Sequence, residues 1–290
     1  MRFANRREAG RRLSASLEHL AVEQPVVVGL PRGGMPVAFE VAQALKAPLD
    51  VLVVRKLGCP WQPELGVGAL GEGGIRLLNE PLMRSAGVSR TALTKVIRHE
   101  DAELQRRVQR YRGDRGPTPV AGRTVIVVDD GIATGYTARA GIEVLRHRGA
   151  QRVVLAVPVA PADVLAELRT VADEVVCTYI PRSFGAIGRF YEDFAQTSDE
   201  DVASLLAARL IGATRWLGTR PGLAQLQIGY FGASTGAGAA LRAAGQLTPQ
   251  IGAVVSRGGR PYLAAPHHGE VEGPTASPAG ARPPPPLDVR

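Results

Sequence analysis

Short apolar runs alternate with amphipathic segments along the first two thirds of the chain. PVVVGL at 25–30 is followed by an amphipathic stretch at 35–45 and by a second apolar run, LDVLVVRK, at 49–56. The same order returns later, with expected strands at 124–130, 152–160 and 174–180 and expected helices at 137–149 and 161–171. Strands made of continuous Val, Ile and Leu are typical of a parallel sheet that helices cover on both faces. The pattern therefore predicts an α/β fold with a mainly parallel sheet flanked by helices.

The stretch between the two halves of this pattern has a different character. Residues 57–68 are rich in Pro and Gly, and a GEGG turn separates the short apolar run VGAL at 67–70 from another at 75–79. We expect this region to be a mobile excursion from the sheet. Ser89 is placed to cap the long helix that follows it, over 90–112.

The last third of the chain changes twice in composition. A helical run at 199–217 precedes a Gly/Pro break, and a strand at 226–231 then leads into a helix of small residues. From about residue 264 the chain is rich in Pro and poor in large apolar residues, which predicts a disordered tail. The expected domains are 1–207, a partial second fold at 208–263, and the tail at 264–290.

Composition and charge exclude several classes of protein. The apolar runs of this 290-residue chain are much shorter than the roughly 18 residues of a membrane span, and the charged N-terminus has no apolar stretch behind it. We therefore expect a cytoplasmic protein without membrane partners. Cys59 and Cys177 are isolated and predict neither a disulfide framework nor a zinc site. The net charge of +8 comes from arginines scattered among acids without interleaved aromatic residues, which disfavours nucleic acid as a partner.

The stretch VIVVDDGIATGYT at 125–137 carries the clearest chemical signal. Asp129 and Asp130 end a β-branched strand, and a Gly-containing loop then opens a helix. Unpaired N–H groups at a helix N-terminus can hold a phosphate, so we expect a cradle formed by Gly131, Ala133, Thr134, Gly135 and Thr137. Two adjacent carboxylates would repel that phosphate, so they must face hydroxyls or a cationic centre. The stretch lacks the Lys of a P-loop, the GxGxxG spacing, and the separated acids of a DxD phosphatase.

This string resembles the phosphoribosyl pyrophosphate binding motif of type I phosphoribosyltransferases, and the resemblance extends over residues 1 to about 200. It implies the type I phosphoribosyltransferase fold with a hood over the base. It also implies that Asp129 and Asp130 hold the ribose hydroxyls and stabilise positive charge on the ribose ring. The strings RKLG and QPELGVGA are similar to those of bacterial phosphoribosyltransferases whose base the sequence does not identify.

Two further segments match the family in the expected order. Arg32 and Gly33, in the turn PRGG after the first strand, resemble the loop that holds pyrophosphate through backbone amides and one arginine. Arg55 and Lys56 resemble the basic residues next to the flexible loop that closes over the substrate, with a solvated strand end as the alternative.

The hood is expected at 181–194, where the chain is rich in aromatic residues. Phe184, Ile187, Phe190 or Tyr191 could stack on a planar base. The alternative is that these aromatic side chains only seal the edge of the sheet.

The resemblance implies an enzyme that transfers the ribose 5-phosphate of phosphoribosyl pyrophosphate to a nitrogenous base and releases pyrophosphate, as in nucleotide salvage. Mg²⁺ would be the cofactor, bound mainly through the substrate pyrophosphate, so no dedicated set of metal ligands is expected. No general base is identifiable, because all five histidines lie outside the matched motifs. A homodimer is possible. The alternative from another class is a regulatory module that binds phosphoribosyl pyrophosphate or a nucleotide without turnover.

A GxSxG string at 232–236 adds a third possibility, a serine hydrolase. The stretch from about 208 to 261 resembles part of the dienelactone-hydrolase-like α/β-hydrolases, with Ser234 in the place of the nucleophile. No oxyanion loop precedes it, and His267 and His268 come before the downstream acids, which is the wrong order for a triad. We therefore expect a truncated hydrolase-like segment without activity.

Overall fold

The computed structural model of the chain describes residues 1–112, 116–233, 235–247, 251–257 and 275–276. The chain divides into two compact units. The first unit comprises Met1–Gln109 and Gly116–Leu205, and the second comprises Arg110–Arg115 and Leu206–Arg290.

A five-stranded parallel sheet forms the centre of the first unit. Its strand order is β2-β1-β6-β7-β8, and every neighbouring pair runs parallel. The strands are β1 (Val26–Gly29), β2 (Leu49–Val51), β6 (Thr124–Val128), β7 (Arg152–Val159) and β8 (Glu174–Tyr179). The helices that connect them are α2 (Gly34–Ala44), α5 (Tyr136–His147) and α6 (Ala162–Leu168). The prediction of an α/β fold with a parallel sheet is confirmed.

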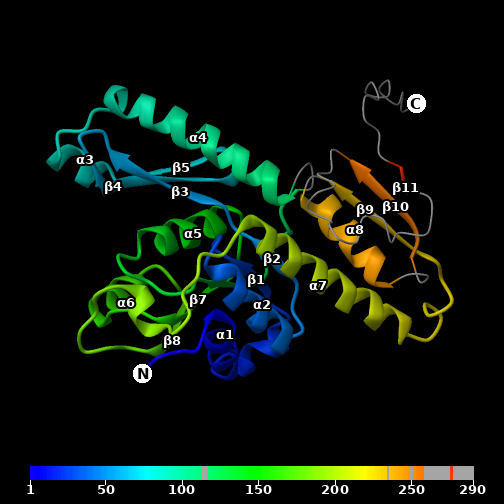
Figure 1. Cartoon of the computed structure of the whole chain (residues 1–290). Coiled ribbons are helices and arrows are strands. Elements are labelled where there is room, and N and C mark those ends of the chain that lie inside the picture. The colour runs from blue at the N-terminus through cyan, green and yellow to red at the C-terminus, as the bar shows by residue number, and fades with distance from the viewer. Residues whose placement is uncertain (113–115, 234, 248–250, 258–274, 277–290) are drawn as a thin grey trace, which may run out of the picture. The chain divides into compact units, whose positions relative to one another are not determined.

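Helices cover both faces of this sheet (Figure 1). Alternate residues of each strand point to opposite faces, so Val27 packs with α1 and α2 while Val26 and Val28 pack with α5 and α6. Because the central strands are buried on both faces, they read as continuous apolar runs. Each fully buried Val or Leu contributes roughly 1.5–3 kcal/mol, so the two apolar layers hold the sheet rigid.

The expected single strand at 49–56 is divided between two sheets, which corrects the prediction. After β2 the chain leaves the parallel sheet and enters a three-stranded antiparallel sheet, ordered β3-β4-β5. Its strands are β3 (Val54–Cys59), β4 (Gln62–Gly71) and β5 (Ile75–Leu78), with η2 (Glu72–Gly74) before β5. The division falls at Val53, whose N–H donates to the buried carboxylate of Glu72 at 2.8 Å. That bond takes Val53 out of the parallel ladder.

The Pro/Gly-rich segment 57–68 leaves the parallel sheet, as expected, but it forms strands of this antiparallel sheet instead of an irregular loop. Its glycines allow close packing of the strands. A Cβ on Gly58 would lie 2.4 Å from the carbonyl oxygen of Pro63, and a Cβ on Gly68 would lie 2.4 Å from the carbonyl oxygen of Leu77. Glycine here serves close approach within a sheet, a role that the local sequence does not distinguish from a loop.

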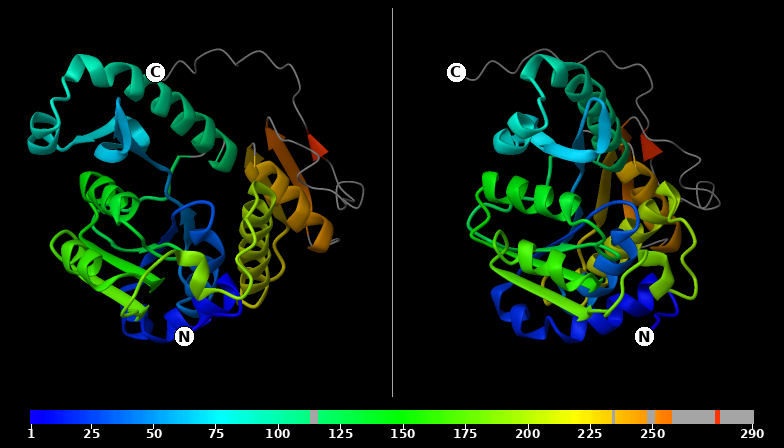
Figure 2. Two further views of the ribbon diagram at one scale, coloured as in Figure 1. Left: turned by 60° about the vertical axis from the view of Figure 1, so that its left-hand side comes forward. Right: turned by 90° about the vertical axis from the view of Figure 1, so that its left-hand side faces the viewer.

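Two further helices complete this part of the first unit, α3 (Glu80–Ser85) and α4 (Arg90–Arg112). The expected cap of α4 is confirmed, since the N–H of Ala92 donates to Oγ of Ser89 at 3.0 Å. The antiparallel sheet has α5 on one side and α4 on the other (Figure 1 and Figure 2).

The N-terminal residues pack against the segment that follows β8. Phe3 exchanges backbone hydrogen bonds with Phe190 and Glu192, at 2.7 and 2.8 Å. The elements next to this pairing are α1 (Arg6–Ala15) and η3 (Ile187–Phe190), and η1 (Glu18–Glu23) follows α1 along the chain. Phe3, Phe190 and Tyr191 belong to one apolar cluster, which also includes Val159 at the end of β7. The two ends of the first unit therefore meet at the carboxyl edge of the sheet.

The second unit contains a strand, a helix and a second strand in parallel arrangement. Its elements are β9 (Ile228–Ala233), α8 (Thr235–Leu247), β10 (Ile251–Arg257) and β11 (Thr275–Ala276), preceded by α7 (Asp199–Gly218). Small residues on α8, including Ala240 and Ala244, pack on Tyr230 and Val254. The expected strand at 226–231 and the small-residue helix after it are both present.

Two of the C-terminal predictions fall largely on residues that the structure does not describe. Ser234 lies outside the described residues, as do 264–274 and 277–290 of the expected tail. Thr275 and Ala276 are described, and they pair with Val254 and Val255 as strand β11 instead of lying in a structureless tail.

None of the described helices combines the length and the apolar character needed to cross a membrane. Cys59 and Cys177 are both free thiols, as the sequence predicts.

Candidate functional site

Two turns lie side by side at the carboxyl edge of the parallel sheet. β1 and β6 are adjacent strands, with Gly29 opposite Val128. The turn PRGG follows the first strand and the acid pair Asp129 and Asp130 follows the second, so sheet pairing brings the two segments together. In open α/β sheets this edge is where ligands bind.

Two glycines allow the turns to touch. A Cβ on Gly33 would lie 2.2 Å from Oδ2 of Asp130, and a Cβ on Gly34 would lie 2.7 Å from the carbonyl oxygen of Val128. Either side chain would displace the acid pair or the end of β6. The sequence pattern Gly-Gly therefore has a steric cause here, and it places Arg32 in the same small region as both carboxyl groups.

Asp130 is held by groups from both ends of the first unit. Nε of Arg6, the first residue of α1, donates to Oδ2 of Asp130 at 2.7 Å, and each side chain is only 11% exposed. Nη1 of Arg6 donates to the carbonyl of Ala195, and its guanidinium lies 3.9 Å from the ring centre of Phe194. The hydroxyl of Tyr191 donates to the carbonyl oxygen of Asp130 at 2.5 Å. Both the side chain and the backbone of Asp130 are thus fixed.

The two carboxyl groups have raised pKa values. Burial raises the pKa of Asp129 well above its usual range, and the adjacent charge of Asp130 raises it further. Burial also raises the pKa of Asp130, while the hydrogen bond and positive charge of Arg6 oppose that rise. The pKa of the Tyr191 hydroxyl is raised by burial and by Asp130, so it stays protonated and remains a donor. Ionisation of at least one of these carboxyl groups therefore costs free energy, and a bound cation or hydroxyl would lower that cost.

A cavity of about 180 Å³, which we call the anion cavity, lies between the acid pair and the start of α5. Its lining includes Asp129 together with all five residues predicted to hold phosphate: Gly131, Ala133, Thr134, Gly135 and Thr137. Gly135 precedes the 12-residue helix with a φ of 74°, a left-handed conformation that suits glycine and turns the loop into the helix. The unpaired N–H groups of that helix start and the positive end of its dipole favour an anion in this cavity.

A second cavity, of about 650 Å³, shares Thr137 with the first. Its lining includes Pro31 and the predicted residues Arg55 and Lys56. Arg55 forms an ion pair with Glu100 of α4 at 2.6 Å. Both basic residues lie on strand β3, which pairs with β4 in the antiparallel sheet.

Comparison with known proteins identifies the family. A Mycobacterium tuberculosis protein named "Putative phosphoribosyl transferase" is 39% identical to this chain, and the match covers 97% of the chain and 86% of that protein. The chain belongs to the phosphoribosyl transferase family. The profile of the phosphoribosyl transferase domain matches residues 67–194. The crystal structure of TT1426 from Thermus thermophilus is 41% identical, with a TM-score of 0.63, over 71% of this chain and 97% of that one.

These relatives confirm the family and fold predicted from the acid pair and its loop, and they identify the protein as a phosphoribosyltransferase. The match to the Mycobacterium protein extends over 381 residues, which exceeds the 290 residues of this chain. The relative therefore contains residues that have no counterpart here.

The aromatic residues expected to contact a base are mostly buried in this phosphoribosyltransferase. Tyr191 is 1% exposed, and its ring packs between Phe3 and Phe194 with centroid distances of 5.5 and 5.0 Å. No face of that ring is left for a planar ligand, so Tyr191 acts on the site through its hydroxyl. Phe184 is half-buried and stacks on Phe190 at 5.4 Å. The alternative, that the aromatic residues seal the edge of the sheet, fits these positions better.

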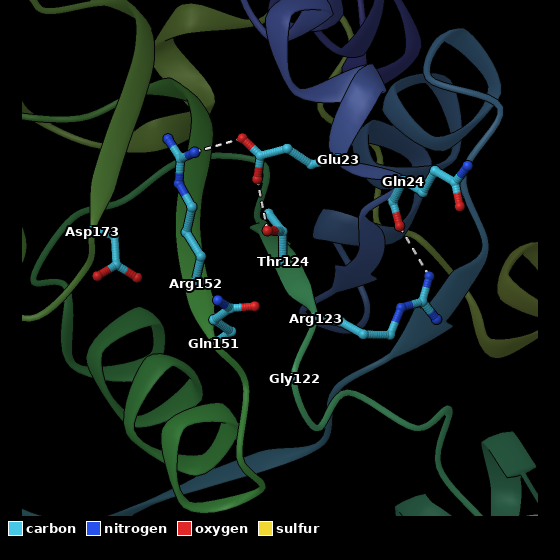
Figure 3. A pocket seen from close by; sticks show the side chains of 8 residues that line it. All are labelled: Glu23, Gln24, Gly122, Arg123, Thr124, Gln151, Arg152 and Asp173. Atoms are coloured by element: carbon cyan, nitrogen blue, oxygen red, sulfur yellow. Dashed lines mark hydrogen bonds and ion pairs between the residues drawn. The ribbon is translucent and has the colours of Figure 1, made fainter.

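A cavity of about 720 Å³ lies at the opposite edge, where the strands begin (Figure 3). Arg152, at the start of β7, pairs there with Glu23 at 2.5 Å and with Glu174 at 2.6 Å. Thr124 donates to Glu23 at 2.7 Å, and Arg123 donates to the carbonyl of Gln24 (Figure 3). These charges are matched to one another, and the cavity is far from the acid pair along the strands. It is larger than the anion cavity, but its chemistry is that of a structural ion-pair network.

Arg6 is the site residue that the sequence did not reveal. It belongs to a basic N-terminal stretch, and no motif connects that stretch with an acid pair more than 120 residues away. Its placement depends on the start of α1, where the side chain of Asn5 accepts the N–H of Glu8 at 3.0 Å. The helix-capping pattern is visible in the sequence, but the tertiary contact is not.

We expect Arg6→Gln to move the acidic limb of the pH profile of kcat/KM to higher pH. Arg6 opposes the rise in the pKa of Asp130, so its loss makes that carboxylate harder to ionise. Arg11→Gln is the matched control, because Arg11 is an exposed arginine of the same helix that pairs with Glu40. A pH profile of Arg6→Gln that coincides with those of the wild type and the control would contradict the role assigned to Arg6.

Proposed function

We propose that the protein transfers the ribose 5-phosphate group of phosphoribosyl pyrophosphate to a nitrogenous base with the help of Mg²⁺. The observation that carries the proposal is the acid pair beside an anion cavity at the start of α5, in direct contact with the turn that holds Arg32. Family membership supports the type of reaction. The base, the metal and a place in nucleotide salvage are inferences from chemistry.

The 5-phosphate of the substrate fits the cavity formed by residues 131–137. Its volume of about 180 Å³ suits a single phosphate group with its hydrating contacts. Backbone N–H groups and the hydroxyls of Thr134 and Thr137 supply donors, and the helix dipole adds a favourable field. This anchor fixes one end of the ribose, so the acid pair meets its other side.

Asp129 and Asp130 would bind the ribose hydroxyls and stabilise positive charge on the ring. The bond from C1 to the pyrophosphate oxygen breaks with its electron pair going to pyrophosphate, while a base nitrogen forms the new bond to C1 and releases its proton to solvent. Positive charge on C1 and the ring oxygen is greatest between these events. A carboxylate in a partly buried site stabilises that charge more strongly than one in water.

The residues present fit Mg²⁺ in a limited way. Carboxylate oxygens are suitable ligands, and Asp129 lines the cavity. Within the described part of the chain no cluster of three or more His, Cys, Asp or Glu could hold a metal ion. Asp129 and Asp130 would therefore hold the ion together with substrate oxygens, and the ion would neutralise charge on the pyrophosphate.

The test is pyrophosphate release. The purified chain is mixed with phosphoribosyl pyrophosphate, Mg²⁺ and one purine or pyrimidine base at a time, and pyrophosphate is measured. We expect release that requires both the metal and one class of base. Saturable binding of phosphoribosyl pyrophosphate without release in any mixture would favour the alternative, a regulatory module that does not turn its ligand over.

A further inference from the structure

Helix α4 forms one wall of the 650 Å³ cavity. The opposite side is formed by β3, by Pro31 in the turn after β1, and by Thr137 at the start of α5. The residues that α4 contributes include Lys95, His99 and Arg107, which we call the α4 wall. They lie on one side of the helix because residues four apart in sequence are neighbours on a helix surface. None of the sequence motifs described above lies on this helix.

Some charged side chains that line the cavity have ion-pair partners and others do not. Glu100, an acid of the same lining, pairs with Arg55, and Arg107 pairs with Glu103 at 2.7 Å. Lys95 and His99 have no hydrogen bond or ion pair within the described residues. The α4 wall therefore keeps donors for an anion that the protein itself does not supply.

The cavity shares a lining residue with the proposed donor site. Thr137 lines both this cavity and the anion cavity next to Asp129. Pro31 lines it from the turn that also carries Arg32. An anion in the larger cavity would thus lie next to a molecule whose phosphate occupies the smaller one, and 650 Å³ is ample for a diphosphate.

We infer that Lys95 and His99 of the α4 wall bind the diphosphate of the donor and neutralise the charge that it gains on leaving. This inference rests on the proposed function and names residues outside its motifs. A Lys ammonium and an imidazole N–H both form charge-assisted hydrogen bonds to phosphate oxygens. Because the leaving oxygen gains charge as its bond to C1 breaks, these bonds strengthen along the reaction. The antiparallel sheet and α4 would serve to carry this wall over the turn PRGG.

The test uses the two parts of the donor as separate probes. The full chain, wild type and Lys95→Ala/His99→Ala, is titrated by calorimetry with pyrophosphate plus Mg²⁺ and, separately, with ribose 5-phosphate. We expect the variant to bind pyrophosphate more weakly by about tenfold or more, while its affinity for ribose 5-phosphate is unchanged. Arg98→Ala is the matched control, since Arg98 is an exposed cation of α4 that does not line the cavity.

The outcomes separate this inference from the proposed function. Pyrophosphate affinity that is equal in the wild type, the double variant and the Arg98→Ala control would overturn the inference and leave the proposed function intact. Equal weakening for both probes would also overturn it, because the substitutions would then disturb the site as a whole. A wild-type chain that binds neither probe would overturn the proposed function and the inference with it. Circular dichroism and melting of each variant verify that α4 is intact.

Discussion

Asp129→Asn is expected to reduce kcat for transfer by roughly 10²–10³-fold while raising the melting temperature or leaving it unchanged. The carboxyl group has a raised pKa because of burial and the neighbouring charge of Asp130, so its ionisation lowers the free energy of unfolding. A neutral amide of the same shape removes that cost. It also removes the negative charge that, in the proposed mechanism, stabilises the ribose ring, and the expected size of the loss comes from other electrostatic groups in enzymes. Steady-state kinetics and thermal melting of the two proteins measure both effects.

The pH dependence of stability supplies a control on this argument. The folded-state pKa of Asp129 lies above its unfolded value, so the stability associated with this group is present at low pH and is lost as pH rises through the folded pKa. The advantage of Asp129→Asn over the wild type should therefore be largest at neutral pH and shrink on acidification. Asp130→Asn should differ, because it breaks the partly buried pair with Arg6 and so lowers the melting temperature. An Asp129→Asn variant with wild-type turnover would contradict the role of the acid pair.

Gly33→Ala is expected to reduce transfer by about a hundredfold or more, since displacement of a catalytic group by about 1 Å can cost that much. The backbone of Gly33 has φ −59° and ψ −37°, which alanine adopts readily. The added Cβ, however, would lie 2.2 Å from Oδ2 of Asp130 and 2.8 Å from its Cγ. Asp130 must then move, and its bond to Arg6 must lengthen. Kinetics and the affinity for phosphoribosyl pyrophosphate report the result.

Gly212→Ala is the matched control for that substitution. Gly212 lies within α7, and a Cβ placed there would meet no atom within 4 Å. The same chemical change should stabilise this helix by about 1 kcal/mol and leave turnover unaltered. Full activity in Gly33→Ala would show that the two turns are not in contact as described.

The parallel sheet and the acid-pair loop were predictable because their signals are local. β6 and the start of α5 are encoded by contiguous residues, in which an apolar strand, two acids and a Gly-containing loop each follow from short-range chemistry. The five residues predicted to hold phosphate line one cavity with Asp129 for the same reason. Glycine in 57–68 misled the prediction, because close strand packing and loop flexibility select the same residue.

The contacts that complete the site depend on long-range packing. Arg6 reaches Asp130 only because Phe3 pairs with Phe190 and brings α1 to the carboxyl edge of the sheet. The burial of the Tyr191 ring could not be predicted from its own segment, because it depends on contacts with Phe3 and Phe194. The role proposed for α4 could not be predicted either, because Lys95 and His99 belong to an ordinary charged helix until the fold places them in the same cavity lining as Thr137.

Calorimetric titration with phosphoribosyl pyrophosphate tests the central claim most directly. The wild-type chain and the Asp129→Ala/Asp130→Ala variant are each titrated with and without Mg²⁺. The account predicts saturable, Mg²⁺-dependent binding to the wild type, with one site per chain, and loss of that binding in the double variant. Binding that is unchanged in the double variant, or no binding to the wild type in the presence of Mg²⁺, would contradict the assignment of the acid pair and its cavity as the donor site.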